Sequence, residues 1–207
     1  MQRELKNQQT RRRIMDSALL EFSNRGYGAS SINTICSAEH ISKGIIYHYF
    51  DTKDALFLAC VKECFDLLTN YLQENIQSMQ GRPEKQLEHY FTTRQAFFQK
   101  YPVYQRIFCE AVISPPGHLR EAIQERKQRF DMLNIQILEE LLNQVTLRPQ
   151  VTRAEVIDTF RQFQDFINAN DRVTELCPAE FTEREKRCRK ALNILLYGVI
   201  DQEAYHD

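Results

Sequence analysis

Apolar side chains recur at a spacing of three or four residues along most of the chain, which is the period of an amphipathic helix. The clearest such stretch predicts a first helix over about residues 8–25. Its apolar positions are Ile14, Met15, Ala18, Leu19 and Phe22. Gly26 and Gly28 follow and end the predicted helix, because glycine favours the conformations in which helices terminate.

Two short helices are expected next. Ile32 and Ile35 are three residues apart in a segment at 31–38 that Ser30 or Ser31 can cap, and a third helix at about 42–50 begins at Ser42. His40 and Ile41 form the turn between these helices. Three apolar residues are expected to hold the third helix on the first two: Ile41, Ile46 and Phe50. Two short helices joined by a tight turn are typical of a helix-turn-helix, so this pattern indicates a DNA-binding unit.

The rest of the chain also shows helical patterns. A long fourth helix starts at an Asp51 or Thr52 cap and is predicted to end near Gly81-Arg82-Pro83. Later helices are expected at about 84–100, 103–113, 118–145, 153–173 and 183–203, the last two starting at capping boxes, Thr152–Glu155 and Thr182–Glu185. The predicted fold is therefore all-α with about nine helices, in which a DNA-binding domain (1–54) is joined through the fourth helix to a helical bundle (55–207).

Charge is distributed unevenly along the 207 residues. Residues 1–53 carry a net charge of +3 and residues 54–207 a net charge of −4. A basic N-terminal part suits a polyanionic partner, in agreement with the helix-turn-helix. No apolar stretch reaches the roughly 18 to 20 residues that span a bilayer, and the first nine residues lack the apolar core of a signal peptide. We therefore expect a cytoplasmic protein without a membrane contact.

The segment from Ser42 to Lys53 carries side chains that bond to phosphate oxygens and base edges. Tyr47 and Tyr49 are two positions apart on the helix, so at least one of them should be exposed. Arg11, Arg12 and Arg13, at the start of the first helix, either reach a phosphate backbone or form a solvated basic face.

Enzyme and metal chemistry find little support in the sequence. The six cysteines form no CxxC pair, and the five histidines are scattered, so no metal site is expected. No nucleophile elbow, zinc-protease, phosphate-loop or dinucleotide motif is present. We expect a chain that is not an enzyme, binds no cofactor or metal, and keeps its cysteines as free thiols. Cys60 and Cys64 are neighbours four positions apart on the fourth helix, which leaves a redox role open.

The first 55 or so residues, about a quarter of the chain, resemble the DNA-binding domain of TetR-family bacterial transcriptional regulators. The matching motifs, in order, are Ile14-x3-Ala18-x3-Phe22, Gly26-Tyr27, Ser31-x2-Thr34-Ile35 and Ile41-Ser42-Lys43-Gly44-x2-Tyr47-x-Tyr49-Phe50-x2-Lys53-x2-Leu56. One departure is Glu39-His40, which stands in the turn where the family usually has Ala-Gly. Histidine tolerates a left-handed turn less well than glycine does, so either a slightly strained turn or a different end of the second helix is expected, and the exact placement of the third helix stays open.

The resemblance implies which residues bind double-stranded DNA. By alignment with the family, Lys43, Gly44 and Ile45 lie nearest the bases: Lys43 reaches guanine acceptors, and Ile45 touches a thymine methyl group. The phosphate-binding residues are then Ser31, Ser42, Tyr47, Tyr49 and Lys53. His48 adds a further polar contact.

The resemblance also implies a homodimer whose last two helices form a four-helix bundle, and a small-molecule effector that binds the C-terminal domain and releases DNA. The sequence supports the dimer separately, because the last helix is broadly apolar: Ala191, Leu192, Ile194, Leu195, Leu196, Val199 and Ile200. Packing of that face within one subunit is the alternative.

The expected function is thus a sequence-specific transcriptional regulator, a repressor released from a palindromic operator by an effector. One alternative keeps the DNA binding but makes the sensor a thiol switch through Cys60, Cys64 or Cys109. Another is an architectural DNA binder without an effector. Aromatic residues after Pro83 suit a flat or apolar effector, and His89, Arg94 or Glu110 could orient it; the sequence does not rank these contacts, and the effector and operator stay open.

Overall fold

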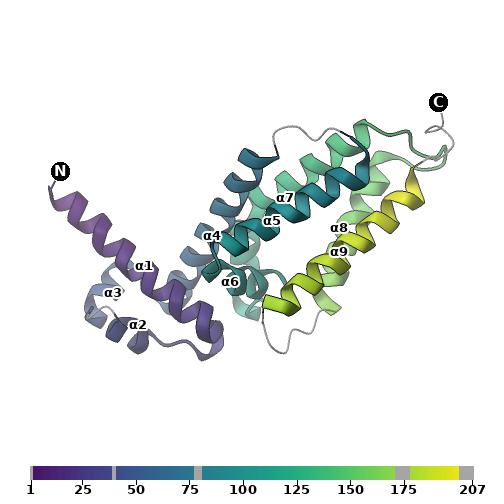
Figure 1. The fold of residues 1–207 in the computed structure, drawn as a ribbon. Coiled ribbons are helices and arrows are strands. Elements are labelled where there is room, and N and C mark those ends of the chain that lie inside the picture. The colour runs from purple at the N-terminus through teal and green to yellow at the C-terminus, as the bar shows by residue number, and fades with distance from the viewer. Residues whose placement is uncertain (1, 39–40, 77–80, 171–177, 201–207) are drawn as a thin grey trace. The chain divides into compact units, whose positions relative to one another are not determined.

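Helices make up nearly all of the regular structure. The computed structural model describes residues 2–38, 41–76, 81–170 and 178–200 (Figure 1). In these ranges the α-helices are α1 (Gln2–Ala29), α2 (Ile32–Ala38), α3 (Lys43–Tyr49), α4 (Lys53–Asn75), α5 (Pro83–Lys100), α6 (Val103–Val112), α7 (Arg120–Asn143), α8 (Arg153–Asn170) and α9 (Pro178–Val199). A 3-10 turn, η1 (Gly117–Leu119), precedes α7, and an isolated bridge joins Leu147 to Ile200. The predicted all-α fold is confirmed.

The first three helices pack through the apolar positions that the sequence indicates. The stripe of α1 is buried, with Ile14, Ala18 and Phe22 all 0% exposed. Ile35 on α2 and Ile46 on α3 are also fully buried, so each short helix contributes an isoleucine to the same core. Helices of seven residues are not stable alone, and this burial is what holds them.

Helix α1 begins at Gln2, six residues before the predicted start. Residues 3–9 are all exposed, so packing does not explain the extra turns. The segment is rich in arginine, glutamate, leucine, lysine and glutamine, which all have high helix propensity. Amphipathic spacing alone does not detect such a polar extension.

The predicted end of α4 near Gly81 is wrong, because the helix ends at Asn75. Its apolar repeat stops at Leu72, and the three residues that follow are polar. The Asn75 side chain donates a hydrogen bond to the carbonyl of Tyr71 (2.7 Å), four positions earlier in the helix.

The predicted start of α9 is also wrong. The helix begins at Pro178, a residue that suits the first helical position because it has no amide hydrogen to satisfy. The Thr182–Glu185 motif therefore lies inside the helix and does not cap it. Glu185 is buried, and its carboxylate accepts a hydrogen bond from Arg94 Nε (2.7 Å). The other motif is confirmed as a capping box: Thr152 N donates to Glu155 (2.8 Å), and Glu155 N donates to Thr152 Oγ1 (3.3 Å).

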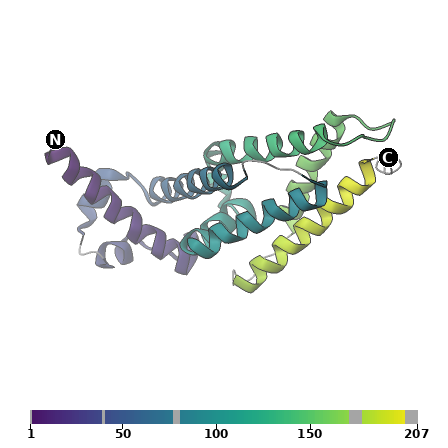
Figure 2. The same cartoon turned by 45° about the horizontal axis from the view of Figure 1, so that its top comes forward.

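The chain forms two compact units. The first contains the residues up to Leu67 together with Lys100–Gln128, and the second contains Leu68–Gln99 with the chain from Arg129 onward. In the first unit, α6 packs on α1, although the two helices are distant in sequence. In the second, α8 and α9 lie side by side in both views (Figures 1 and 2).

A buried polar cluster lies in the second unit. Arg94 is hydrogen bonded to Glu185 and to the hydroxyl group of Tyr90 (3.2 Å), and that hydroxyl group donates to Asn134 (2.6 Å). Burial of a charge is tolerated where it is paired in this way. Among the described helices, none is both long and apolar enough to cross a membrane.

Candidate nucleic-acid interface

Helix α3 has one buried side and one exposed side. Ile46 is 0% exposed and Phe50, which follows the helix, is 6% exposed; Ile41, just before it, is also buried. The predicted role of these three residues as apolar anchors is confirmed. The residues between them face outward: Ser42, Lys43, Gly44, Ile45, Tyr47 and His48 are exposed, and Tyr49 is half-buried.

The exposed side includes two large apolar or aromatic side chains. Ile45 is 43% exposed and Tyr47 is 46% exposed, which is unusual for such residues on a seven-residue helix. Gly44 leaves open space, since an added Cβ would meet only Ser42 Oγ at 4.0 Å. A surface that combines a lysine, an uncovered glycine and an exposed isoleucine can approach base edges closely and contact a thymine methyl group.

Serine side chains define the starts of both short helices. Ser31 Oγ accepts a hydrogen bond from Asn33 N (3.1 Å), and Ser42 Oγ accepts one from Ile45 N (3.3 Å). The Ser42 cap is the one expected from the sequence, and of the two candidates for the second helix, Ser30 and Ser31, it is Ser31 that caps it. The intervening Glu39-His40 turn lies outside the described residues. A backbone hydrogen bond from Ile41 N to the carbonyl of Cys36 (2.9 Å) connects the two sides of that turn.

Lys53, expected to bind phosphate, has protein partners in the structure. Its ammonium group donates to the carbonyls of Tyr27 (2.7 Å) and Ser30 (3.1 Å) and lies 4.3 Å from the centre of the Tyr27 ring. Lys53 therefore ties the start of α4 to the end of α1. Two of its three protons are used in this way, and a phosphate contact would use the third.

Tyr27 is a junction that the sequence did not reveal. Its hydroxyl group donates to Asp54 and lies 3.2 Å from Nε2 of His118, which is itself 3.2 Å from Asp54 Oδ2. Its backbone N–H donates to both carboxylate oxygens of Glu110, at 3.0 and 3.2 Å. Burial and the hydrogen bond to Asp54 raise the pKa of Tyr27 to about 12. The neighbouring Gly26 is the only sequence signal that an unusual conformation occurs here.

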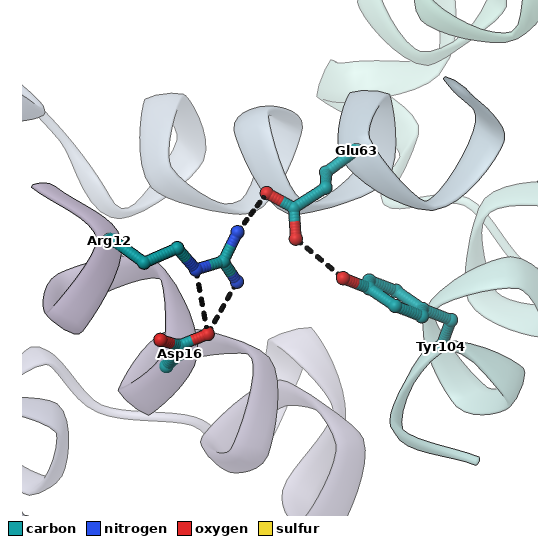
Figure 3. Close-up of polar contacts among 4 residues, drawn as sticks. All are labelled: Arg12, Asp16, Glu63 and Tyr104. Carbon is teal, nitrogen blue, oxygen red and sulfur yellow. Dashed lines mark hydrogen bonds and ion pairs between the residues drawn. The ribbon is translucent and has the colours of Figure 1, made fainter. Parts of the chain in front are cut away.

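A second network connects α1, α4 and α6 (Figure 3). Arg12 donates to Asp16 (2.8 Å) and to Glu63 (2.7 Å), and the other oxygen of Glu63 accepts from the Tyr104 hydroxyl group (2.5 Å). The hydrogen bonds with Asp16 and Glu63 raise the pKa of Arg12 above its ordinary value. The Arg12 side chain is 47% exposed, and its guanidinium group is engaged by these two carboxylates. The Arg11 guanidinium lies 5.2 Å from the centre of the Phe50 ring.

The three thiols considered for a redox switch are buried, whereas Cys36 of the same unit is partly exposed. Cys60 and Cys64 are 0% exposed and Cys109 is 1% exposed. Burial raises the pKa of Cys60 and Cys64 above the ordinary thiol value, which favours the unreactive protonated form. Cys64 also donates to the carbonyl of Tyr104 (3.7 Å). Such an environment is typical of structural cysteines and does not favour a redox sensor.

The three polar residues considered for effector binding have different surroundings. Arg94 lies in the buried cluster of the second unit, and Glu110 holds the Tyr27 backbone in the first. His89 is exposed and lies 3.1 Å from the carbonyl of Asn75. Within the described residues, no group of three or more histidine, cysteine, aspartate or glutamate side chains is arranged to hold a metal ion.

Comparison with known sequences gives a matching family model and a similar regulator. Residues 14–60 match the family model described as "Bacterial regulatory proteins, tetR family". The chain is 35% identical over 63 residues to IcaR, the HTH-type negative transcriptional regulator of the biofilm operon icaADBC of Staphylococcus aureus; this match covers 30% of the chain and 34% of IcaR. The chain thus spans about a third of the length of this relative.

Solved structures resemble the chain over almost its whole length. A TetR family transcriptional regulator from Chloroflexus aurantiacus superposes with a TM-score of 0.60 at 20% identity, covering 94% of this chain and 95% of that one. The regulator FadR from Bacillus subtilis, solved with stearoyl-CoA, superposes with a TM-score of 0.61 at 15% identity and covers 85% and 96%. At these identities the likeness concerns the fold, which joins a helix-turn-helix to a helical C-terminal part.

Proposed function

Because the chain belongs to the tetR family of bacterial regulatory proteins, we propose that it is a sequence-specific repressor, released from a palindromic operator by a small-molecule effector. The observation that carries the proposal is the two-sided helix α3. Its buried isoleucine fixes the helix, and its outer side presents Lys43, Gly44 and Ile45 beside exposed Tyr47 and His48.

Each residue has a proposed role in that interface. Lys43 donates to guanine acceptors, Ile45 packs on a thymine methyl group, and Gly44 lets the helix backbone approach the bases. Residues at the edges of the two short helices bind phosphates: Ser31, Ser42, Tyr47, Tyr49 and Lys53. His48 supplies a further polar contact. The proposed DNA-binding domain spans residues 1–54, and the effector and dimer domain spans 55–207.

The proposed homodimer is supported by apolar side chains on the two adjacent helices α8 and α9. Phe166 is 62% exposed, Ile194 is 64% exposed and Tyr197 is 47% exposed. Large exposed apolar residues on neighbouring helices favour an interface between subunits. The other half of the α9 apolar face packs inside the subunit, where Leu192, Leu196 and Ile200 are buried. Packing within one subunit accounts for this buried part, and the proposed dimer would cover the exposed part.

A dimer sets the operator geometry. Two copies of α3 would enter successive major grooves about 34 Å apart, so the operator is expected to be a near-palindrome. The effector domain is supported by the all-helical C-terminal part, and FadR, which shares the fold, was solved with stearoyl-CoA. Since the proposed target of the chain is chromosomal DNA, we place the protein in the cytoplasm.

Selection of bound sites from random duplexes by the purified full chain tests this proposal. The expected result is a palindromic motif whose half-sites lie one helical turn or slightly more apart. Binding without any motif, with an affinity that depends only on salt, would favour the architectural alternative and overturn the specific regulator. Loss of binding on oxidation that a cysteine-to-serine change abolishes would instead support the thiol switch.

A further inference from the structure

The end of α1 is kinked at Gly26, which has φ 73° and ψ 168°. This conformation is costly for any residue with a side chain. Steric crowding imposes a second requirement, because a Cβ at this position would lie 2.2 Å from Oε1 of Glu110 and 2.9 Å from the guanidinium group of Arg106. Glycine at position 26 therefore allows both the kink and the close approach of a carboxylate from α6.

Glu110 uses that approach to hold the next residue. Both of its carboxylate oxygens accept the backbone N–H of Tyr27, across 83 positions of sequence. The Glu110 side chain is only 14% exposed, and burial raises the pKa of its carboxyl group, while the Tyr27 N–H and Arg106 oppose that rise. Arg106 adds an anchor of its own through a hydrogen bond to the carbonyl of Asn24 (3.0 Å). Glu110 and Arg106 of α6 thus hold the C-terminal end of α1 through hydrogen bonds to its backbone.

From Tyr27 the contacts lead directly to the helix-turn-helix. The Tyr27 carbonyl accepts hydrogen bonds from Lys53 (2.7 Å) and from Ser30 Oγ (2.8 Å). The next residue, Ser31, caps α2, and its own N–H is held by Glu21 (3.0 Å). Only four positions separate the residue that Glu110 holds from the N-cap of α2.

We infer that Glu110 is a positioning residue for the proposed DNA interface: through the Tyr27 backbone it fixes the end of α1, from which α2 and α3 start. The inference rests on the proposed DNA-binding function. A recognition site keeps its specificity only when its elements are held to within about 0.5 Å. Glu110 belongs to α6 and acts on the interface through other residues.

Binding of the full chain to the selected operator and to a scrambled duplex tests this role. Replacement Glu110→Ala removes the acceptor and is expected to lower the operator-to-scrambled affinity ratio about tenfold, the scale of one mismatched base pair. Scrambled binding should change little, because phosphate contacts dominate it. Replacement Glu110→Gln keeps a carbonyl oxygen for the Tyr27 N–H and should restore most of the ratio. Glu121→Ala, an exposed glutamate of the same compact unit, is the matched control.

A role confined to stability would give a different pattern. In that case Glu110→Ala would lower the folded fraction and weaken binding to both duplexes equally, so the affinity ratio would not change. That result would overturn the inference, and so would an unchanged ratio in a fully folded variant.

Amide hydrogen exchange of the free protein is a second measurement that needs no operator. Residues 27–38 should exchange faster in Glu110→Ala than in Glu121→Ala, and equal exchange would contradict the role. If the wild-type chain selects no DNA motif, the proposed function fails, while exchange still decides whether Glu110 holds this junction.

Discussion

Tyr27 makes contacts through its backbone, its hydroxyl group and its ring. Its N–H, carbonyl and hydroxyl groups each bind a different part of the chain, and its ring packs on Phe57 (4.9 Å between ring centres) and under the Lys53 ammonium group. In the sequence, Gly26-Tyr27 indicates only the end of a helix. In the structure, Tyr27 connects the end of α1 to α4 and α6.

The hydroxyl group of Tyr27 should titrate late. Its pKa is raised from 10 to about 12, by burial first and then by the hydrogen bond to Asp54. A raised pKa means that the fold favours the protonated form, so the associated stability is complete below pH 10 and is lost as pH rises toward 12. The tyrosinate absorbance of the wild type minus that of Tyr27→Phe should therefore show a midpoint near pH 12. A midpoint near 10 would mean that the burial of this hydroxyl group and its contact with Asp54 do not persist in solution.

The two lysines of the proposed interface should respond differently to replacement. Lys43 is exposed, so Lys43→Ala should leave thermal stability unchanged and relax preference at one base pair by about 1–3 kcal/mol. Lys53→Ala should weaken all DNA sequences alike, and it should also lower the melting temperature because it breaks two hydrogen bonds to carbonyls. Gel shifts on specific and scrambled duplexes, together with thermal unfolding, check both. Equal losses of specificity would contradict this division of roles.

At the scale of helices, the network centred on Glu63 connects α1, α4 and α6. Arg12→Ala removes its ion pairs with Asp16 and Glu63, which are partly exposed, so the free energy of unfolding should fall by only about 1 kcal/mol. Because Arg12 is held by carboxylates, the slope of log affinity for DNA against log salt should not change. Urea unfolding and salt titrations measure the two effects. A slope reduced by about one unit would instead identify Arg12 as a phosphate contact.

The sequence predicted the helices whose boundaries depend on local chemistry. The apolar stripe of α1, the serine caps of α2 and α3, and the Thr152–Glu155 capping box are all determined by residues within a few positions of one another. The predicted start of α9 was wrong because the Thr182–Glu185 motif does not reveal that Glu185 is hydrogen bonded to Arg94, 91 positions away.

The candidate site was predictable to a similar extent. The outward side of α3 follows from helical spacing around Ile46, and the structure leaves those residues exposed as an interface requires. The contacts of Glu110 with Tyr27 and of Tyr104 with Glu63 depend on α6 packing against distant helices, so no local pattern encodes them. Their discovery needs the tertiary arrangement.

At the scale of the whole molecule, the proposed dimer makes a direct prediction. The double replacement Ile194→Glu with Tyr197→Glu puts carboxylates on the exposed apolar side of α9 and should yield monomers in sedimentation velocity experiments, since unpaired charges are not tolerated in an apolar interface. Operator affinity should fall while binding to a single half-site persists. Met132→Glu, which alters an apolar residue of α7 that is 65% exposed, is the control. A variant that remains dimeric would place the interface elsewhere.

The compact unit that contains the helix-turn-helix is assembled from two separate stretches of sequence, the residues up to Leu67 and Lys100–Gln128. Recombination between related genes exchanges contiguous stretches. A crossover after residue 54 or 67 would give Tyr27 an unfamiliar partner in place of Glu110, and a crossover after residue 67 would also give Glu63 a foreign residue in place of Tyr104. Engineered chimeras that take the helix-turn-helix from this chain should therefore also take residues 100–128. The same residue pairs are expected to constrain the natural exchange of DNA-binding segments between related genes.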